Sequence, residues 1–237
     1  MFHKNLLAAS HPLQVPIFKE LVKLIENLRS QLAKNTMLTI YTVSENINAK
    51  ELEHLADTLI PPLLKKAADT NAFLAESADQ ALVSLCYQLP ETRIMKCLQS
   101  CNTKSNPMKL KLAFCYNALI EKLGGKIRQS REMERLIQAV ASLLNEGAIE
   151  VRNMAKIGLV KLKNNLGSQR ELEAILNRCV TNEKQLEKIK QMIDKNDFDS
   201  ISNTGSTRYG SSMRTSLYQE QKVEKVDRKL NGTHGNI

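Results

Sequence analysis

Five cysteines and four histidines are the side chains in this 237-residue sequence best suited to metal binding or nucleophilic catalysis. Cys97 and Cys101 are four residues apart, so a helix would place both thiols on one face, as a metal pair requires. No further Cys or His follows at metal-ligand spacing, and His54 is remote in the sequence. The pair therefore favours packing in a helical core, and the sequence predicts no metal site.

Catalytic motifs are also missing from the sequence. None of the histidines, which are His3, His11, His54 and His234, has a neighbouring Ser or Cys in an arrangement that indicates a nucleophile. The stretch Gly124-Gly125-Lys126 lacks the spacing of a phosphate-binding loop and is better interpreted as a helix stop. We therefore expect a non-enzymatic protein with no cofactor and no small-molecule substrate.

A short apolar pattern occurs twice, in residues 71–85 and 148–162. When Ala78 is aligned with Ala155, apolar or small residues recur at i, i+4, i+7, i+8 and i+11, which is one face of a helix. A weaker third copy is centred on Cys115, although Lys111 and Lys122 interrupt its apolar face. The spacing of about 40 residues is typical of HEAT repeats, in which small residues on an inner helix let the neighbouring repeat approach closely.

Helical periodicity predicts ten helices that pair, in order, into five repeats. The predicted segments are 15–27, 30–47, 49–68, 72–88, 91–101, 107–123, 130–145, 148–165, 169–179 and 182–193. Helix-capping and helix-breaking residues support these limits: Asn106-Pro107 begins a helix, Gly124-Gly125 ends one, and Ser168 begins a capping box. Pro61-Pro62 should kink or split segment 49–68. With 4% aromatic residues and no Trp, the composition argues against a β sandwich or barrel and favours an all-α HEAT-repeat solenoid.

Composition divides the chain into an N-terminal extension (1–14), a repeat domain (15–195) and a tail (196–237) that we expect to be disordered. The net charge is +9, and the tail contains six basic and five acidic residues, so the preceding residues carry +8. A cationic domain indicates an acidic partner. Nucleic acid is disfavoured because interleaved aromatics are lacking. No apolar run is long enough for a signal peptide or a membrane span, so we expect a cytoplasmic protein without a membrane partner.

Several stretches resemble, in order and spacing, the TOG domains of microtubule regulators. They are Leu28-Arg29-Ser30, residues 63–74, Ala81-Leu82, and Glu150-Val151-Arg152 followed by Ala155-Lys156. The sequence is most similar to the crescerins, which are TOG-array regulators of axonemal microtubules, and next to the cytoplasmic linker-associated proteins. The resemblance covers about residues 20–190.

The resemblance implies a paddle of HEAT repeats that binds tubulin or microtubules through the loops joining the two helices of each repeat. In this sequence those loops are 27–30, 69–72, 102–106, 146–148 and 180–182, and the implied tubulin-binding residues are Arg29, Ser30, Thr70, Asn71, Lys104, Lys109, Arg152 and Lys156. Exposed charge pairs contribute under about 1 kcal/mol each, so several must act together. The implied location is the cytoskeleton, with the cilium or axoneme as a candidate site.

Other interpretations stay open. TOG domains usually have six repeats, and the first commonly presents a tryptophan to tubulin, whereas this chain has no Trp and about 14 residues before its first predicted helix. We therefore expect the first repeat to be missing or vestigial in this sequence. Arg152 is equally well interpreted as a structural arginine that pairs with a neighbouring repeat, and Asn71 as an ordinary helix N-cap. The alternative function is a general HEAT-repeat scaffold for an acidic or helical protein segment, and self-association through the end repeat is also open.

Overall fold

The computed structural model describes residues 14–101 and 103–194, which form eleven α-helices and one 3-10 helix with no strand among them. The helices are α1 (Gln14–Ile25), α2 (Ser30–Asn46), α3 (Ala49–Glu53), α4 (Ala56–Ala67), α5 (Ala72–Gln88), α6 (Glu91–Ser100), α7 (Asn106–Leu123), η1 (Gly124–Gln129), α8 (Met133–Leu143), α9 (Ile149–Leu166), α10 (Gln169–Cys179) and α11 (Glu183–Asp194). The predicted all-α class is confirmed. The predicted extension and the predicted tail lie almost wholly outside the described residues.

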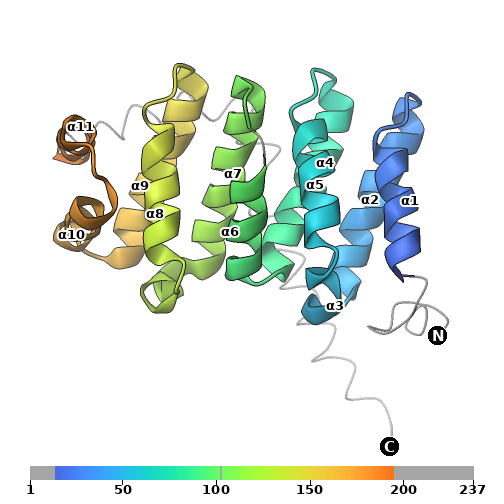
Figure 1. Cartoon of the computed structure of the whole chain (residues 1–237), viewed down its shortest axis with the longest axis horizontal. Helices are drawn as coiled ribbons and strands as arrows, with labels where there is room; N and C mark the ends of the chain where they lie inside the picture. The colour runs from blue at the N-terminus through green and yellow to red at the C-terminus, as the bar shows by residue number, and fades with distance from the viewer. Residues whose placement is uncertain (1–13, 102, 195–237) are drawn as a thin grey trace, which may run out of the picture. The chain divides into compact units, whose positions relative to one another are not determined.

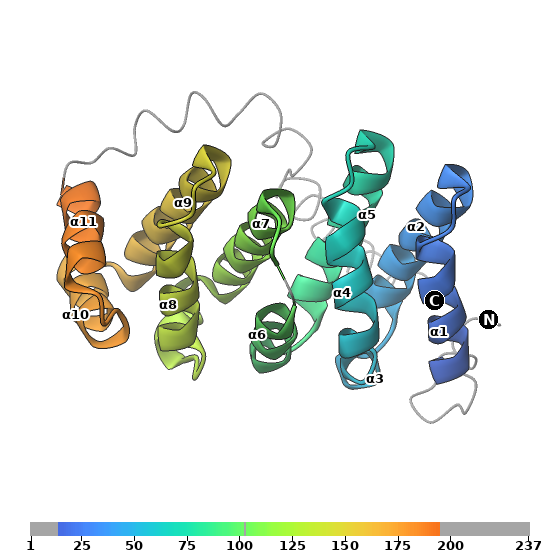
Figure 2. The same cartoon turned by 45° about the horizontal axis from the view of Figure 1, so that its top comes forward.

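Five helix pairs follow one another along the described chain: α1 with α2, α4 with α5, α6 with α7, α8 with α9, and α10 with α11 (Figure 1). The inner helices α2, α5, α7 and α9 contact one another in sequence order. The outer helices α1, α4, α6 and α8 form a second layer, which Figure 2 separates from the first. This arrangement is the HEAT-type solenoid that the repeated apolar pattern predicts.

Small residues at the centre of the inner helices are buried, as the pattern predicts. Ala78, Cys115 and Ala155 are all inaccessible to solvent or nearly so. Gly158 on α9 shows why the position must be small, because a Cβ there would lie 2.8 Å from Oδ1 of Asn117 on α7. Adjacent inner helices are therefore close enough that one methyl group matters.

Both lysines that interrupt the third copy of the pattern have partners inside the fold. Lys111 on α7 forms an ion pair with Asp79 on α5, with 2.5 Å between Nζ and Oδ2 and neither side chain more than 16% exposed. Lys122, near the end of α7, donates to the backbone carbonyl of Leu89. Inward-facing lysines are tolerated here because each one satisfies a group of the preceding repeat.

The ends of several helices follow from their sequences. Side-chain oxygens of Asn71, Ser105 and Ser168 each accept a backbone N–H from the first turn of the helix that follows. Gly124 ends α7 with φ of 49°, and Gly167 ends α9 with φ of 66°. These positive φ values favour glycine, so both glycines act as helix stops.

Two elements differ in detail from the predicted segments. The predicted helix 49–68 is split, but the break lies at His54 and Leu55, and both Pro61 and Pro62 lie inside α4. Each proline removes one backbone donor from the helix, so two carbonyls one turn earlier lose their helical partners. The second difference is η1, which continues the chain as a 3-10 helix after the predicted stop at Gly124 and delays the start of α8 to Met133.

Candidate protein-binding edge

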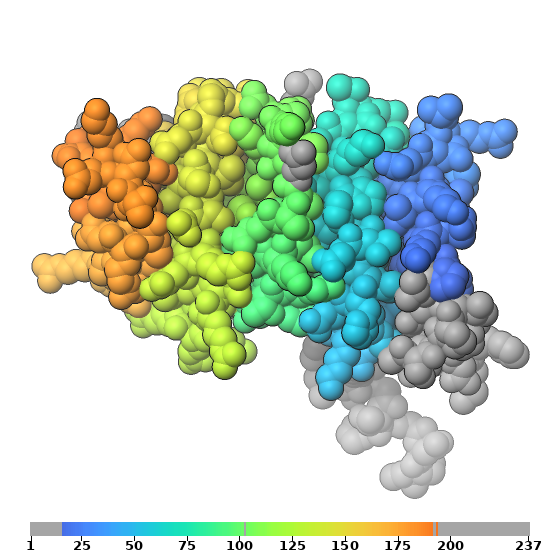
Figure 3. All heavy atoms as spheres, in the orientation of Figure 1, coloured from blue at the N-terminus to red at the C-terminus, as the bar shows by residue number. Residues whose placement is uncertain are grey.

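Loops within the first four helix pairs lie together along one edge, at the top of Figure 1. They comprise residues 26–29, 68–71, 101–105 and 144–148, of which residue 102 is outside the description. We call this set the loop edge. The connections between successive pairs (47–48, 89–90, 124–132 and 167–168) lie at the other end of the helices. The predicted placement of the intra-repeat loops is therefore confirmed for these four pairs, and the rim that they form is seen along the top of Figure 3.

The first loop is a tight turn that presents three consecutive side chains to solvent. Oδ1 of Asn27 accepts a hydrogen bond from the backbone N–H of Arg29 at 2.9 Å, which fixes the turn before α2. Leu28, Arg29 and Ser30 are all exposed, and Arg29 has no ion pair within the described residues. This loop therefore offers a cation and an apolar side chain next to each other.

Hydrogen bonds to Asp69 and Asn71 shape the second loop. Oδ1 of Asp69 accepts from the N–H of Asn71 at 3.0 Å, and Oδ1 of Asn71 accepts from the N–H of Phe73 at 3.1 Å. The hydrogen bond from Asn71 and the nearby Lys66 ammonium together lower the pKa of Asp69. Thr70 and Asn71 are exposed. Asn71 is thus a helix N-cap, as one interpretation of the sequence has it, while its position on the edge is also accessible.

The third and fourth loops are joined by an ion pair. Nζ of Lys109, in the first turn of α7, lies 2.5 Å from Oε2 of Glu146 in the fourth loop, and both side chains are about three-quarters buried. Lys104 is exposed and has no ion pair among the described residues. Of the two lysines predicted here as contacts, only Lys104 presents a free ammonium group to a partner.

Arg152 secures the fourth loop. Its guanidinium donates to the backbone carbonyls of Glu146 at 2.8 Å and Gly147 at 2.6 Å. The residue is structural, and among the described residues both of these bonds stabilise the loop of its own helix pair, whereas the sequence-based alternative had it pair with a neighbouring repeat. Lys156, one turn farther along α9, is partly exposed and has no ion pair in the described part of the chain.

Four exposed apolar side chains lie on or beside the loop edge, and the sequence analysis did not identify them as site residues. The exposed fraction is 101% for Leu28, 37% for Leu32, 41% for Phe73 and 57% for Ile149. Only one other large apolar side chain among the described residues, Ile17 at 48%, is comparably exposed. A usable signal was present in the sequence, because each of the four lies within three residues of an intra-repeat loop.

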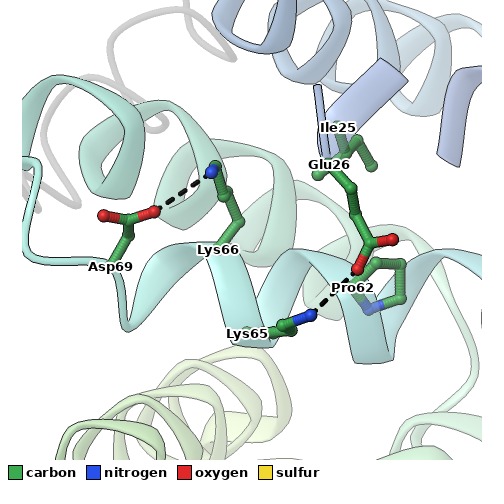
Figure 4. A pocket seen from close by; sticks show the side chains of 6 residues that line it. All are labelled: Ile25, Glu26, Pro62, Lys65, Lys66 and Asp69. Carbon is green, nitrogen blue, oxygen red and sulfur yellow. Dashed lines mark hydrogen bonds and ion pairs between the residues drawn. The ribbon is translucent and has the colours of Figure 1, made fainter. Parts of the chain in front are cut away.

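A recess of about 390 Å³ opens between the first two repeats at the base of the loop edge (Figure 4). Its lining residues are Ile25, Glu26, Pro62, Lys65, Lys66 and Asp69. Lys65 on α4 reaches Glu26 after α1 at 3.0 Å, and Lys66 reaches Asp69 at 3.0 Å. The recess therefore has charged walls whose cations are matched by carboxylates.

The described residues hold no group of three or more His, Cys, Asp or Glu side chains placed to bind a metal ion. Cys97 instead donates to Oδ1 of Asp57 at 3.0 Å, and its burial, together with that carboxylate, raises the pKa of the thiol to about 12. Cys101 donates to the carbonyl of Cys97. None of the described helices combines the length and the apolar character needed to cross a membrane.

An array of stacked helix pairs with its intra-pair loops aligned on one edge defines a HEAT-type helical-repeat domain. The family described as CLASP N terminal, that of the cytoplasmic linker-associated proteins, matches residues 2–191. The chain therefore belongs to this family, and the resemblance to TOG domains drawn from the sequence is confirmed. The finer similarity to the crescerins stays a prediction.

Comparison with solved structures supports the same fold. The MAST/Orbit N-terminal domain is similar with a TM-score of 0.60 and 18% identity, over 77% of this chain and 80% of that chain. An engineered protein is similar with a TM-score of 0.40 and 13% identity, over 83% of this chain and 91% of that chain. Designed armadillo repeat proteins for modular peptide recognition are similar with a TM-score of 0.38 and 14% identity, over 77% of this chain and 83% of that chain. The last two likenesses are too weak to carry an inference. A search of curated protein sequences gave no match.

Proposed function

We propose that the protein is a non-enzymatic binding module for tubulin or the microtubule lattice, and that the loop edge is its contact surface. Membership of the CLASP N-terminal family supports a partner in the microtubule cytoskeleton. The cilium or axoneme is the finer location that we propose, on the similarity to the crescerins. The mechanism is positional: the edge docks on the partner, no bond is made or broken, and no cofactor takes part.

The observation that carries the proposal is that Arg29 and Lys104, on the aligned loops, are exposed and have no ion pair within residues 14–101 and 103–194. Cations at the loops of the first and third repeats suit a partner surface rich in carboxylates. Ser30, Thr70 and Asn71 add exposed hydrogen-bonding groups between them. Lys109 and Arg152 act differently in our proposal, because their charged groups already hold the third and fourth loops in place.

The alternative is a HEAT-repeat scaffold that binds an acidic or helical protein segment across its inner helices. The engagement of Lys109 and Arg152 within the fold favours it to some extent, since these contacts reduce the number of free cations on the loop edge. In either case residues 15–195 are proposed to be the binding domain, with residues 196–237 as a tether.

Charge reversal on the edge tests the proposal. We expect the double variant Arg29→Glu with Lys104→Glu to lose most of its co-sedimentation with stabilised microtubules and its co-elution with unpolymerised tubulin. Both positions are exposed, so helicity should be unchanged. Arg152→Glu is a poor test, because it would release the loop carbonyls that Arg152 holds.

The matched control is Lys50→Glu with Lys126→Glu, which makes the same charge change at exposed positions near the connections between repeats. The control should bind as the unmodified protein does. Equal binding by the edge variant and the control would place the contact elsewhere. An equal loss of binding in the edge variant and the control would mean that binding depends on net charge alone. That result would also argue against a defined edge.

A further inference from the structure

We infer that Leu28 and Phe73 are the apolar anchors of the loop edge, and that they dock on an acidic protein surface that contains an apolar depression. This inference rests on the proposed function, in which that surface belongs to tubulin. It assigns the loops of the first two repeats the role of fixing the partner in place. The free cations then serve mainly to attract and orient it.

Leu28 has no role in the fold that accounts for its side chain. It is as accessible as a residue in an extended peptide, and it lies in a turn that Asn27 and Arg29 hold by a hydrogen bond. Single exposed apolar residues are ordinary, but most surface leucines retain part of their packing. A leucine fully presented on a fixed turn, directly before a free arginine, is suited to burial by a partner.

One face of the Phe73 ring is covered by a lysine of the preceding repeat. Nζ of Lys34, on α2, lies 3.7 Å from the centroid of the Phe73 ring, so the ammonium group covers one face and links the first two repeats. The ring remains 41% exposed in the first turn of α5. Aromatic side chains with restrained rotamers are frequent energetic centres of protein interfaces, because little entropy is lost when they are buried.

The surroundings of these two anchors determine the chemistry of the partner. Arg29 and Lys34 flank them, and the recess lined by Lys65 and Lys66 lies at the base of the same two loops (Figure 4). Lys65 and its partner Glu26 are both more than half exposed, so a partner carboxylate can compete for the ammonium group at little cost. Apolar side chains within a cationic rim are complementary to an apolar depression bordered by carboxylates.

The test compares binding of Leu28→Ser, Phe73→Ala and their combination to unpolymerised tubulin across a salt series. We expect the combined variant to bind roughly tenfold or more weakly, as removal of central anchors does. Its dependence on salt should match that of the unmodified protein, because no charge is changed, whereas Arg29→Ala should flatten that dependence. The Phe73 variant frees Lys34, so Leu28→Ser alone gives the cleaner value.

The matched control is Ile17→Ser, because Ile17 is exposed to a similar extent near the start of α1, away from the loop edge. It should leave affinity unchanged, and thermal unfolding checks that every variant is folded. If the unmodified protein binds while the anchor variants bind equally well, or while Ile17→Ser is equally damaging, the inference is wrong and the proposed function stands. If the unmodified protein binds neither unpolymerised tubulin nor stabilised microtubules, both are wrong.

Discussion

Asp79 is a mostly buried carboxylic acid on an inner helix. It lies on α5 with Oδ2 against Lys111, while its buried Oδ1 has no hydrogen-bond partner in the described part of the chain. Burial disfavours the charged carboxylate and raises the pKa of Asp79 to about 6, although the Lys111 ammonium acts in the opposite direction. Asp57 shows the contrary effect at the surface, where the hydrogen bond from the Cys97 thiol is the largest cause of a lowered pKa.

We predict that the carboxyl carbon of Asp79 titrates near pH 6 in a nuclear magnetic resonance experiment on the folded protein, and that the pKa of Asp57 lies below the ordinary value of an aspartic acid. Lys111→Met should raise the pKa of Asp79 further, because it removes the attraction and leaves the burial. The folded state then holds a proton that the unfolded chain releases, so the contribution of Asp79 to stability declines as pH rises from about 4 to 6. An Asp79 that titrates no higher than Asp57 would contradict this account.

Individual side-chain contacts were the feature of the structure that the sequence predicted least well. The positions of Lys109 and Arg152 near loops followed from the sequence, but their partners did not. Lys109 pairs with a residue 37 positions away, and that proximity exists only after neighbouring repeats have packed. Arg152 bonds backbone carbonyls, which every residue possesses, so no residue type marked its partner. The structure therefore distinguishes exposed cations from structural ones by their burial and their partners. The spacing of residues in the sequence could not make that distinction.

Helices α7 and α9 approach each other closely, and the structure gives the physical cause. Nδ2 of Asn117 donates to the carbonyl of Met154 at 3.0 Å, and Nδ2 of Asn165 donates to the carbonyl of Ile120 at 3.2 Å. Side-chain amides on each helix thus bond the backbone of the other. Gly158 lies between them, where the absence of a Cβ permits this approach.

We predict that Gly158→Ala destabilises the protein by about 1 kcal/mol, measured as the free energy of unfolding in urea. The added Cβ would lie 2.8 Å from Oδ1 of Asn117 and 3.1 Å from Cγ1 of Val140. Overpacking of a close contact costs about 1–3 kcal/mol, whereas replacing glycine by alanine within a helix gains up to about 1 kcal/mol. The loss should therefore exceed the gain.

Gly147→Ala is the comparison for this change, because its Cβ would meet no atom within 4 Å. It should be neutral or slightly stabilising. If Gly158→Ala proves as stable as the unmodified protein, the inner helices have more space between them than the structure indicates.

Helices were largely predictable because their limits have local causes. The caps at Asn71 and Ser168 and the glycine at 124 act within one turn, and the observed ends lie close to the predicted ones. The break at His54 and Leu55 and the 3-10 helix η1 were not placed by sequence patterns. No Gly or Pro marks the break at His54 and Leu55, so no local residue type could have placed it. Gly124 predicted that α7 would end, but not that a 3-10 helix would follow.

At the scale of the whole array, the repeated apolar pattern was enough to predict the order of helices, their pairing and the edge on which the loops lie. The pattern could not predict which side chains the first helix pair presents at the end of the described array. Thr39 on α2 is exposed, and its hydroxyl bonds the carbonyl of Asn35 at 2.8 Å. Self-association through the end repeat stays a prediction.

Hydrogen exchange of the protein with and without bound tubulin tests the central claim, that the loop edge is the contact surface, most directly. We predict that tubulin slows exchange in the intra-repeat loops and the first turns of α2, α5 and α7, most strongly in residues 26–33 and 68–75. Exchange in the connections at 47–48, 89–90, 124–132 and 167–168 should not change. Protection confined to those connections or to the middle of the inner helices, with the loop edge unaffected, would contradict the account.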